Sequence, residues 1–195
     1  MKRNGFTLIE VMIVIAIIAG LIAVGAPRLL KKDANMKTTA RQLAVLAKEI
    51  RNRAKLFNST YRLVIRMDKG DESYWVEKGN GPQMVEPEKI AKELEDRDKP
   101  KEEGAPPPLF AIDKALTKKE RSLPSNMSFA QVETANMSQP LSSGIAYIHF
   151  FPQGIMEASA IQITDKKNTW TLVFNPLTGQ ADIIEKAVNL KDLSR

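Results

Sequence analysis

The stretch KRNGFTLIEVMIVIAIIAGLIAVGAPRLL, residues 2–30, decides how the rest of the chain is interpreted. Residues 11–26 carry no charge, and Glu10 is the one acid between residues 6 and 27. A helix needs about 20 apolar residues to cross a bilayer core of roughly 30 Å. A helix packed on a soluble core would instead show one polar face. The stretch therefore predicts a transmembrane helix over residues 6–30.

A cleaved secretory signal is the alternative interpretation of this segment. Such signals have a shorter apolar core and end in small residues of the A-x-A type. Here Lys2 and Arg3 form a short basic start, and the plausible cleavage position precedes the apolar run rather than following it. These features favour an anchor that stays in the mature chain.

The segment GFTLIE, residues 5–10, resembles the cleavage motif of the type IV prepilins, in which a basic leader and a glycine precede an aromatic residue and, four residues later, an acid. The resemblance implies that a prepilin peptidase cuts between Gly5 and Phe6 and methylates the new amine of Phe6. It implies that residues 1–5 are a leader and that Pro27 kinks the helix. It further implies a subunit of a type IV pilus or of a type II secretion pseudopilus.

Glu10 has a physical role in this interpretation. A carboxylate inside a transmembrane helix costs about 2.5–3.5 kcal/mol, and less near the interface. Cleavage would create a positive amine on Phe6, and the amine of a neighbouring subunit could pair with Glu10, which would set the register of filament assembly. In the alternative hypothesis, Glu10 only reaches the headgroups.

Charge is distributed unevenly along the 195 residues, and the formal charge of +6 hides this. Residues 28–69 contain 12 Lys and Arg against 3 Asp and Glu, whereas the chain from residue 70 contains 15 against 19. Basic residues thus flank both ends of the apolar segment, so they do not decide its orientation. The resemblance places the chain as a single-pass protein of the bacterial inner membrane with its head in the periplasm.

An amphipathic stalk helix is predicted over residues 31–58. Its apolar residues repeat at spacings of four and three, which forms one stripe: Leu43, Ala47, Ile50, Ala54 and Phe57. The basic residues off this stripe, Lys48, Arg51, Arg53 and Lys55, are expected on a solvated face. The alternatives are contact with anionic headgroups or with acidic faces of partner subunits. Asn58 and Ser59 end the pattern.

Residues 59–195 are predicted to form a β-rich head. Alternation over residues 61–67 indicates a half-buried strand, and residues 73–78 indicate its return strand. Further strands are expected over residues 109–112, 127–133, 145–151, 158–164, 169–174 and 180–185. The fold class is therefore α+β, with a long N-terminal helix packed on an antiparallel β-sheet or β-sandwich.

A charged, proline-rich insertion is predicted over residues 82–108. It contains 13 charged residues and six of the 11 prolines. Residues 86–97 are expected to form a short charged helix. Residues 99–108 have nothing apolar to bury, so an exposed loop is expected there.

A second resemblance lies near the C-terminus. The segments FPQG, residues 151–154, and NPLTG, residues 175–179, are separated by two predicted strands and followed by a last one. This arrangement resembles the H-type minor pseudopilins, the GspH/FimT family. In structural terms, both segments are turns built on proline and glycine.

No set of catalytic, metal-binding or cofactor-binding residues is evident in the sequence, so an enzyme is not expected. His149 is the one histidine and is expected to be a packed or exposed strand residue. Asp68, Asp71 and Glu72 could offer oxygen ligands to calcium, but their spacing is not that of a calcium loop. A cysteine site is excluded because the chain has no cysteine.

The sequence thus predicts a minor pseudopilin of a type II secretion system, whose partners are other pilin or pseudopilin subunits, the prepilin peptidase, the inner membrane and secreted cargo. A major subunit fits less well. The alternatives are a FimT-like minor type IV pilin acting in pilus assembly or DNA uptake, and a tethered head that never assembles. Nucleic-acid binding would use basic residues of the head, namely Lys166, Lys167, Lys186, Lys191 and Arg195.

Overall fold

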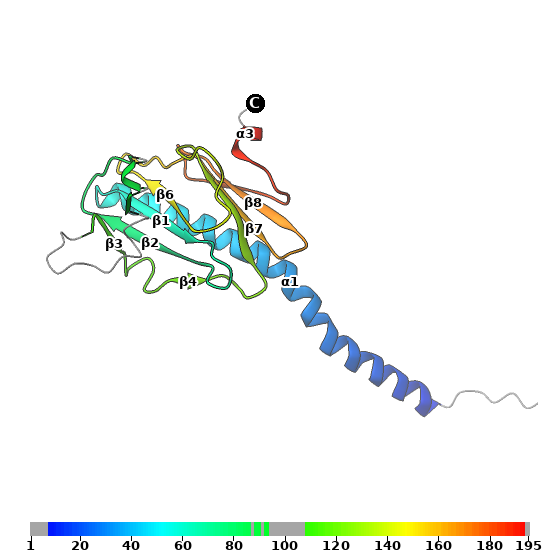
Figure 1. The fold of residues 1–195 in the computed structure, drawn as a ribbon. Coiled ribbons are helices and arrows are strands. Elements are labelled where there is room, and N and C mark those ends of the chain that lie inside the picture. The colour runs from blue at the N-terminus through cyan, green and yellow to red at the C-terminus, as the bar shows by residue number, and fades with distance from the viewer. Residues whose placement is uncertain (1–7, 87, 91, 94–107, 194–195) are drawn as a thin grey trace, which may run out of the picture.

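The chain folds as one long helix laid against two antiparallel sheets (Figure 1). The computed structural model describes residues 8–86, 88–90, 92–93 and 108–193, and within the long helix it describes the side chains of residues 8–20 and 36–56. The arrangement confirms the predicted α+β class.

Helix α1 (Leu8–Leu56) has 49 residues. At 1.5 Å per residue it is roughly 74 Å long. Asn58 ends it in the left-handed conformation, with φ of 45°. The amide of Ser59 donates to the carbonyl of Ala54 (3.2 Å), and the amide of Asn58 donates to that of Lys55 (3.4 Å). This is a Schellman cap, a common helix stop with Gly or Asn in the left-handed position, so the predicted helix end is confirmed.

Sheet A contains five strands in the order β3-β2-β1-β6, with β4 also paired to β2. Its members are β1 (Tyr61–Arg66), β2 (Ser73–Gly79), β3 (Phe110–Ile112), β4 (Arg121–Ser122) and β6 (Ile145–Phe150). The hairpin of β1 and β2 was expected from the sequence and is confirmed. The two-residue strand β4 was not predicted, because two polar residues carry no periodicity.

Sheet B contains four strands in the order β5-β7-β8-β9. They are β5 (Ser128–Thr134), β7 (Ser159–Thr164), β8 (Thr169–Phe174) and β9 (Ala181–Ile184). The run from β7 to β9 is an antiparallel meander, and it confirms the three strands predicted over residues 158–164, 169–174 and 180–185. After β9 the chain forms the short helix α3 (Leu190–Leu193), which was not predicted.

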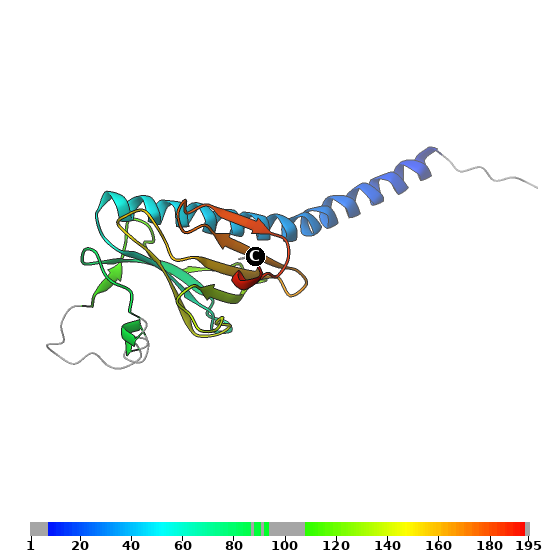
Figure 2. The same ribbon diagram turned by 90° about the horizontal axis from the view of Figure 1, so that it is seen from above.

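One hydrophobic core lies between α1 and the inner faces of both sheets. Figure 2 shows α1 running along one side of the head, with both sheets on the same side of the helix. The core includes Leu43 and Ile50 of α1, Leu63 of β1 and Ile161 of β7, all fully buried. The helix therefore joins the two sheets.

The outer face of sheet A is also buried, which the sequence did not predict. The residues of β1 are buried on both faces except for Arg66, so the prediction of a half-buried strand was wrong. Val64, Trp75 and Tyr147 form a second apolar cluster on this outer face, with Ile90 of the insertion packed against it. Alternation marks which residues share a face but not which faces become covered.

The charged insertion connects β2 to β3. Its ends meet, because the amide of Asn80 donates to the carbonyl of Leu109 (3.2 Å) and Gly79 pairs with Phe110. Residues 88–90 and 92–93 are helical, in line with the expected short helix. The predicted loop at 99–108 lies outside the described residues except for its last one. The insertion therefore leaves the ladder of sheet A intact.

Candidate functional site: the exposed helix and its anchor in the head

The N-terminal part of α1 extends beyond the head (Figure 1), and its exposed side chains are mostly apolar. Every described side chain from residue 8 to residue 20 is exposed. Nine of them are large and apolar, each at least 47% exposed: Leu8, Ile9, Val11, Met12, Ile13, Val14, Ile15, Ile17 and Ile18. Apolar patches of this extent mark surfaces that another molecule covers. This segment is the main candidate site.

Glu10 lies in the first turn of α1 and is exposed. A negative side chain at a helix N-terminus is favourable, because the first amides of the helix carry a partial positive charge. Its exposure leaves the carboxylate accessible to another chain. Gly5 and Phe6, the predicted cleavage and methylation residues, lie outside the described residues, so their roles stay predictions.

Pro27 falls within α1, but its side chain is not described, and its predicted kink stays a prediction. Within the residues that the structure describes, no helix has both the length and the apolar character needed to cross a membrane.

The C-terminal half of α1 anchors the exposed half to the head. Its buried stripe agrees with the predicted one and extends it: Met36, Ala40, Leu43, Leu46, Ala47, Ile50 and Ala54. Phe57 was predicted to belong to this stripe and does not, because it is 47% exposed. Phe57 comes directly after the last turn of α1, which ends at Leu56. The ammonium of Lys78 lies 4.8 Å from the centre of its ring.

Arg51 connects the helix to both turns that resemble the H-type pseudopilins. Its Nε donates to the carbonyl of Gly154, and its Nη2 donates to the carbonyl of Leu177 at 2.8 Å. One turn follows β6 of sheet A, and the other joins β8 to β9 of sheet B. Arg51 was predicted to lie on a solvated face, and this was wrong. Its side chain holds the helix against loops from both sheets.

The glycines of these turns lie against the helix. Gly154 has φ of 81° and Gly179 has φ of 68°, both in the left-handed region. A Cβ on Gly179 would lie 2.5 Å from Cδ of Arg51, and one on Gly154 would lie 2.5 Å from Cδ of Lys55. The two motifs therefore supply close approach to α1 as well as turn geometry.

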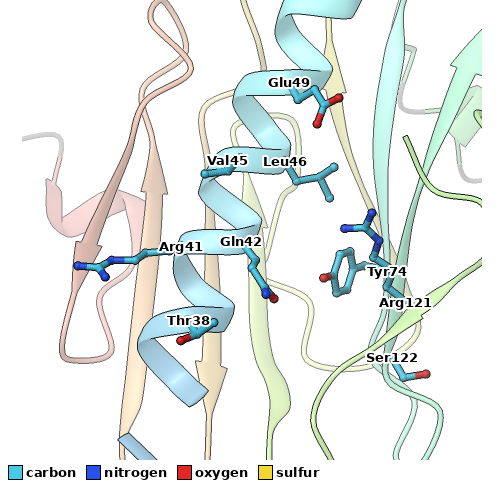
Figure 3. Close-up of a pocket in the computed structure, with 9 residues that line it drawn as sticks. All are labelled: Thr38, Arg41, Gln42, Val45, Leu46, Glu49, Tyr74, Arg121 and Ser122. Carbon is cyan, nitrogen blue, oxygen red and sulfur yellow. The ribbon is translucent and has the colours of Figure 1, made fainter. Parts of the chain in front are cut away.

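A groove of about 740 Å³ separates the exposed side of α1 from β4 (Figure 3). In Figure 3, Leu46 and Gln42 point from the helix toward Tyr74, whereas Arg41 points away from it. The nine lining residues are Thr38, Arg41, Gln42, Val45, Leu46, Glu49, Tyr74, Arg121 and Ser122. They include no paired acid and base and no nucleophile with a neighbouring base, so the groove offers no catalytic arrangement.

The acids considered for calcium have other partners. Asp71 pairs with Arg66 at 3.0 Å. Asp68 accepts from the amide of Gly144, and Glu72 accepts from that of Gly70. The part of the chain that the structure describes holds no group of three or more His, Cys, Asp or Glu residues placed to bind a metal ion.

His149 is a buried strand residue, 2% exposed. Its Nδ1 lies 2.8 Å from Oε2 of Glu157, and the same oxygen accepts the amide of His149 at 2.8 Å. Asn136 donates to the other oxygen of Glu157. These contacts fix the ring within the head, in agreement with a packed strand histidine.

The basic residues considered for nucleic-acid binding do not all lie together on the head. Lys166 and Lys167 lie in the turn between β7 and β8, and Lys186 lies at the same end of sheet B, because its carbonyl accepts from the hydroxyl of Thr171 at 2.7 Å. Lys191 lies apart from them in α3. Arg195 lies outside the described residues.

Comparison with known proteins supports the interpretation of the N-terminus. Residues 1–25 match the family model described as the prokaryotic N-terminal methylation motif. The chain is therefore pilin-like, with a prepilin-type N-terminus ahead of a helix and an antiparallel β head. A search of curated protein sequences gives no match.

A solved structure with some likeness is the minor pseudopilin EpsH from the Type 2 Secretion System of Vibrio cholerae. The two sequences are 10% identical, and the TM-score is 0.44. The alignment covers 78% of this chain and 97% of that one.

Proposed function

We propose that the chain is a minor pseudopilin, a structural subunit of the periplasmic pseudopilus of a type II secretion system. The observation that carries the proposal is the methylation motif over residues 1–25, which includes the exposed apolar start of a helix that a folded head holds by its other half. An arrangement of this kind suits lateral packing of helices in a filament, and we propose no enzymatic activity for it.

In this proposal a prepilin peptidase removes residues 1–5 and methylates Phe6. The apolar surface of residues 8–20 then packs against the helices of other subunits, within the inner membrane before assembly and within the filament afterwards. Glu10 pairs with the new amine of an adjoining subunit, and this pair sets the axial register. The head stays in the periplasm, where it contacts other subunits or cargo.

Replacement of Glu10 by alanine tests the role of the carboxylate. We expect the variant to lose incorporation into filaments in cells, because a buried amine without its partner is costly. The folded head should be unaffected, since Glu10 lies on the exposed helix. Glu49→Gln is the matched control, because Glu49 is an exposed acid on the anchored half of the same helix.

Filament content would be measured by immunoblotting of filaments isolated from the cell envelope, and folding by the circular dichroism of the purified chain in detergent. Normal incorporation of Glu10→Ala would contradict the proposal. Intact-mass analysis of the protein from cells gives an independent test, because the expected product begins at Phe6 and carries one extra methyl group.

A FimT-like minor type IV pilin that binds DNA is the second candidate. It is favoured by the three lysines at one end of sheet B, although Asp165 and Glu185 lie beside them in the sequence. Binding through these lysines should weaken steeply with salt. If the purified chain does not retard DNA at low salt while its deletion reduces enzyme secretion, the pseudopilin proposal is favoured.

A further inference from the structure

A row of ionisable residues lies buried on the outer face of sheet A. Arg62 of β1 is opposite Glu77 of β2 on one side and opposite His149 of β6 on the other. These three side chains are at most 5% exposed. Buried charges are costly unless they are paired and hydrogen-bonded. These residues are not solvated surface charges, so each needs partners within the protein.

Arg62 is held from three directions. Its Nε donates to Oε2 of Glu77 at 2.7 Å. Its guanidinium carbon lies 4.1 Å from the ring centre of Phe110 and 4.1 Å from that of Tyr147. Two rings and one carboxylate therefore fix the planar group, and its remaining edge points to the insertion.

That edge binds Glu93 of the insertion with two parallel hydrogen bonds. Nη1 of Arg62 donates to Oε2 of Glu93 at 2.8 Å, and Nη2 donates to Oε1. Burial alone would lower the pKa of Arg62, but the hydrogen bonds to Glu93 and the charge of Glu77 more than offset this, so its pKa is raised. The paired donors of a guanidinium match the two oxygens of a carboxylate. The site already holds one carboxylate ligand.

The described part of the insertion covers the sheet without filling the space beneath it. The side chain of Glu93 is 37% exposed, and Ile90 rests on the cluster that contains Val64 and Trp75. A cavity of about 620 Å³ remains between the insertion and the sheet, and it is lined in part by Arg62, His149 and the insertion's Met84. Arg62 and Glu93 both line this cavity, so their contact borders a space that the described residues leave unfilled.

We propose that Arg62, Glu77, Phe110 and Tyr147 form a binding site for a carboxylate side chain, that Glu93 fills it within the same chain, and that an acidic peptide segment of another protein displaces Glu93. The insertion is then a competitor tethered to its own binding site. Its sequence is compatible with this role, because residues 86–103 contain eight acidic residues against five basic ones. The proposal does not depend on filament assembly.

The test uses the full chain in detergent and a fluorescent synthetic peptide of residues 83–98 as the probe. Glu93→Gln in the chain removes the tethered competitor and keeps the size of the side chain. Glu88→Gln is the matched control, because Glu88 is an exposed acid of the same helical segment. Arg62 itself is left unchanged, since its loss would leave Glu77 buried without this partner.

We expect the Glu93→Gln chain to bind the peptide at least about tenfold more tightly than the wild-type and Glu88→Gln chains do, as the loss of a charge-assisted competitor implies. A peptide carrying the same Glu93→Gln change should bind the Glu93→Gln chain about tenfold more weakly than the unchanged peptide. Equal binding of the two peptides, equal binding by the three chains, or no binding at millimolar peptide would overturn the proposal.

A second measurement reports release of the insertion. Trp75 is fully buried in the cluster against which Ile90 packs, so lifting the insertion should increase its quenching by acrylamide. With Trp170 replaced by Phe in every chain, quenching should rise in Glu93→Gln and stay unchanged in Glu88→Gln. Unchanged quenching in Glu93→Gln would show that Glu93 does not hold the insertion in place.

Discussion

Replacing Arg51 with methionine removes the two hydrogen bonds that tie α1 to loops of both sheets, while the aliphatic stem of the side chain is kept. A hydrogen bond from a charged donor is worth about 1.5–3 kcal/mol when buried. The bond to Gly154 is partly buried and the bond to Leu177 is exposed. We therefore assign the partly buried bond a value at the low end of this range and the exposed bond a value below it. Together the two bonds give an expected loss of about 2–3 kcal/mol in the free energy of unfolding.

For a chain of this size the loss corresponds to a fall in Tm of about 4–12 °C. The loss in the free energy of unfolding would be measured by urea unfolding of the full chain in detergent, with the fluorescence of the fully buried Trp75 as reporter. Arg53→Met is the matched control. Arg53 lies on the same helix, but its contact with Glu49 is a 3.8 Å ion pair between side chains 26% and 53% exposed.

A pair of this kind contributes roughly 0–0.5 kcal/mol, so Arg53→Met should change stability little. If Arg51→Met and Arg53→Met destabilise the chain to the same extent, the two carbonyl contacts of Arg51 do not hold the helix to the head, and the reasoning is refuted.

Three further predictions concern the same head. Gly179→Ala should destabilise the chain by about 1 kcal/mol more than Gly154→Ala in urea unfolding. Both variants place alanine in the left-handed region, which is strained. The new Cβ at residue 179 meets Arg51, which hydrogen bonds hold in place, whereas the one at residue 154 meets the exposed Lys55. Leu43→Ala, at a fully buried position, should cost about 3 kcal/mol in the same assay. Burial raises the pKa of Tyr61 to about 12, so stability should be intact below pH 10 and fall as the pH rises toward 12. Tyr61→Phe should remove this part of the alkaline loss, and an unchanged pH profile would argue against it.

Much of the secondary structure could be predicted from the sequence, because hydrophobic periodicity and turn residues are properties of neighbouring positions. The helix end at Asn58, the hairpin of β1 and β2 and the meander of sheet B follow from periodicity and from turn residues. The two-residue β4 and the short α3 could not be predicted, since so few residues provide no repeat to detect.

The candidate assembly segment was predicted from the sequence alone, because a motif and an uncharged run are properties of consecutive residues. The positions of Arg51 and Arg62 were not. A helical repeat assigns Arg51 to the side away from the core, and strand alternation assigns Arg62 to the side away from Leu63. Neither pattern shows that a turn or an insertion distant in sequence will cover that side.

The sequence by itself determined where the helix and most of the strands lie, and that the N-terminus carries a prepilin-type methylation motif. Hydrophobic spacing, turn residues and a short motif are encoded in neighbouring positions. Only the tertiary structure decided which charged residues are buried, because burial depends on the elements that fold over them. Val64, Trp75 and Tyr147, all apolar on the same face as Arg62, were the one sequence signal of that cover, and recognising it required the strand register.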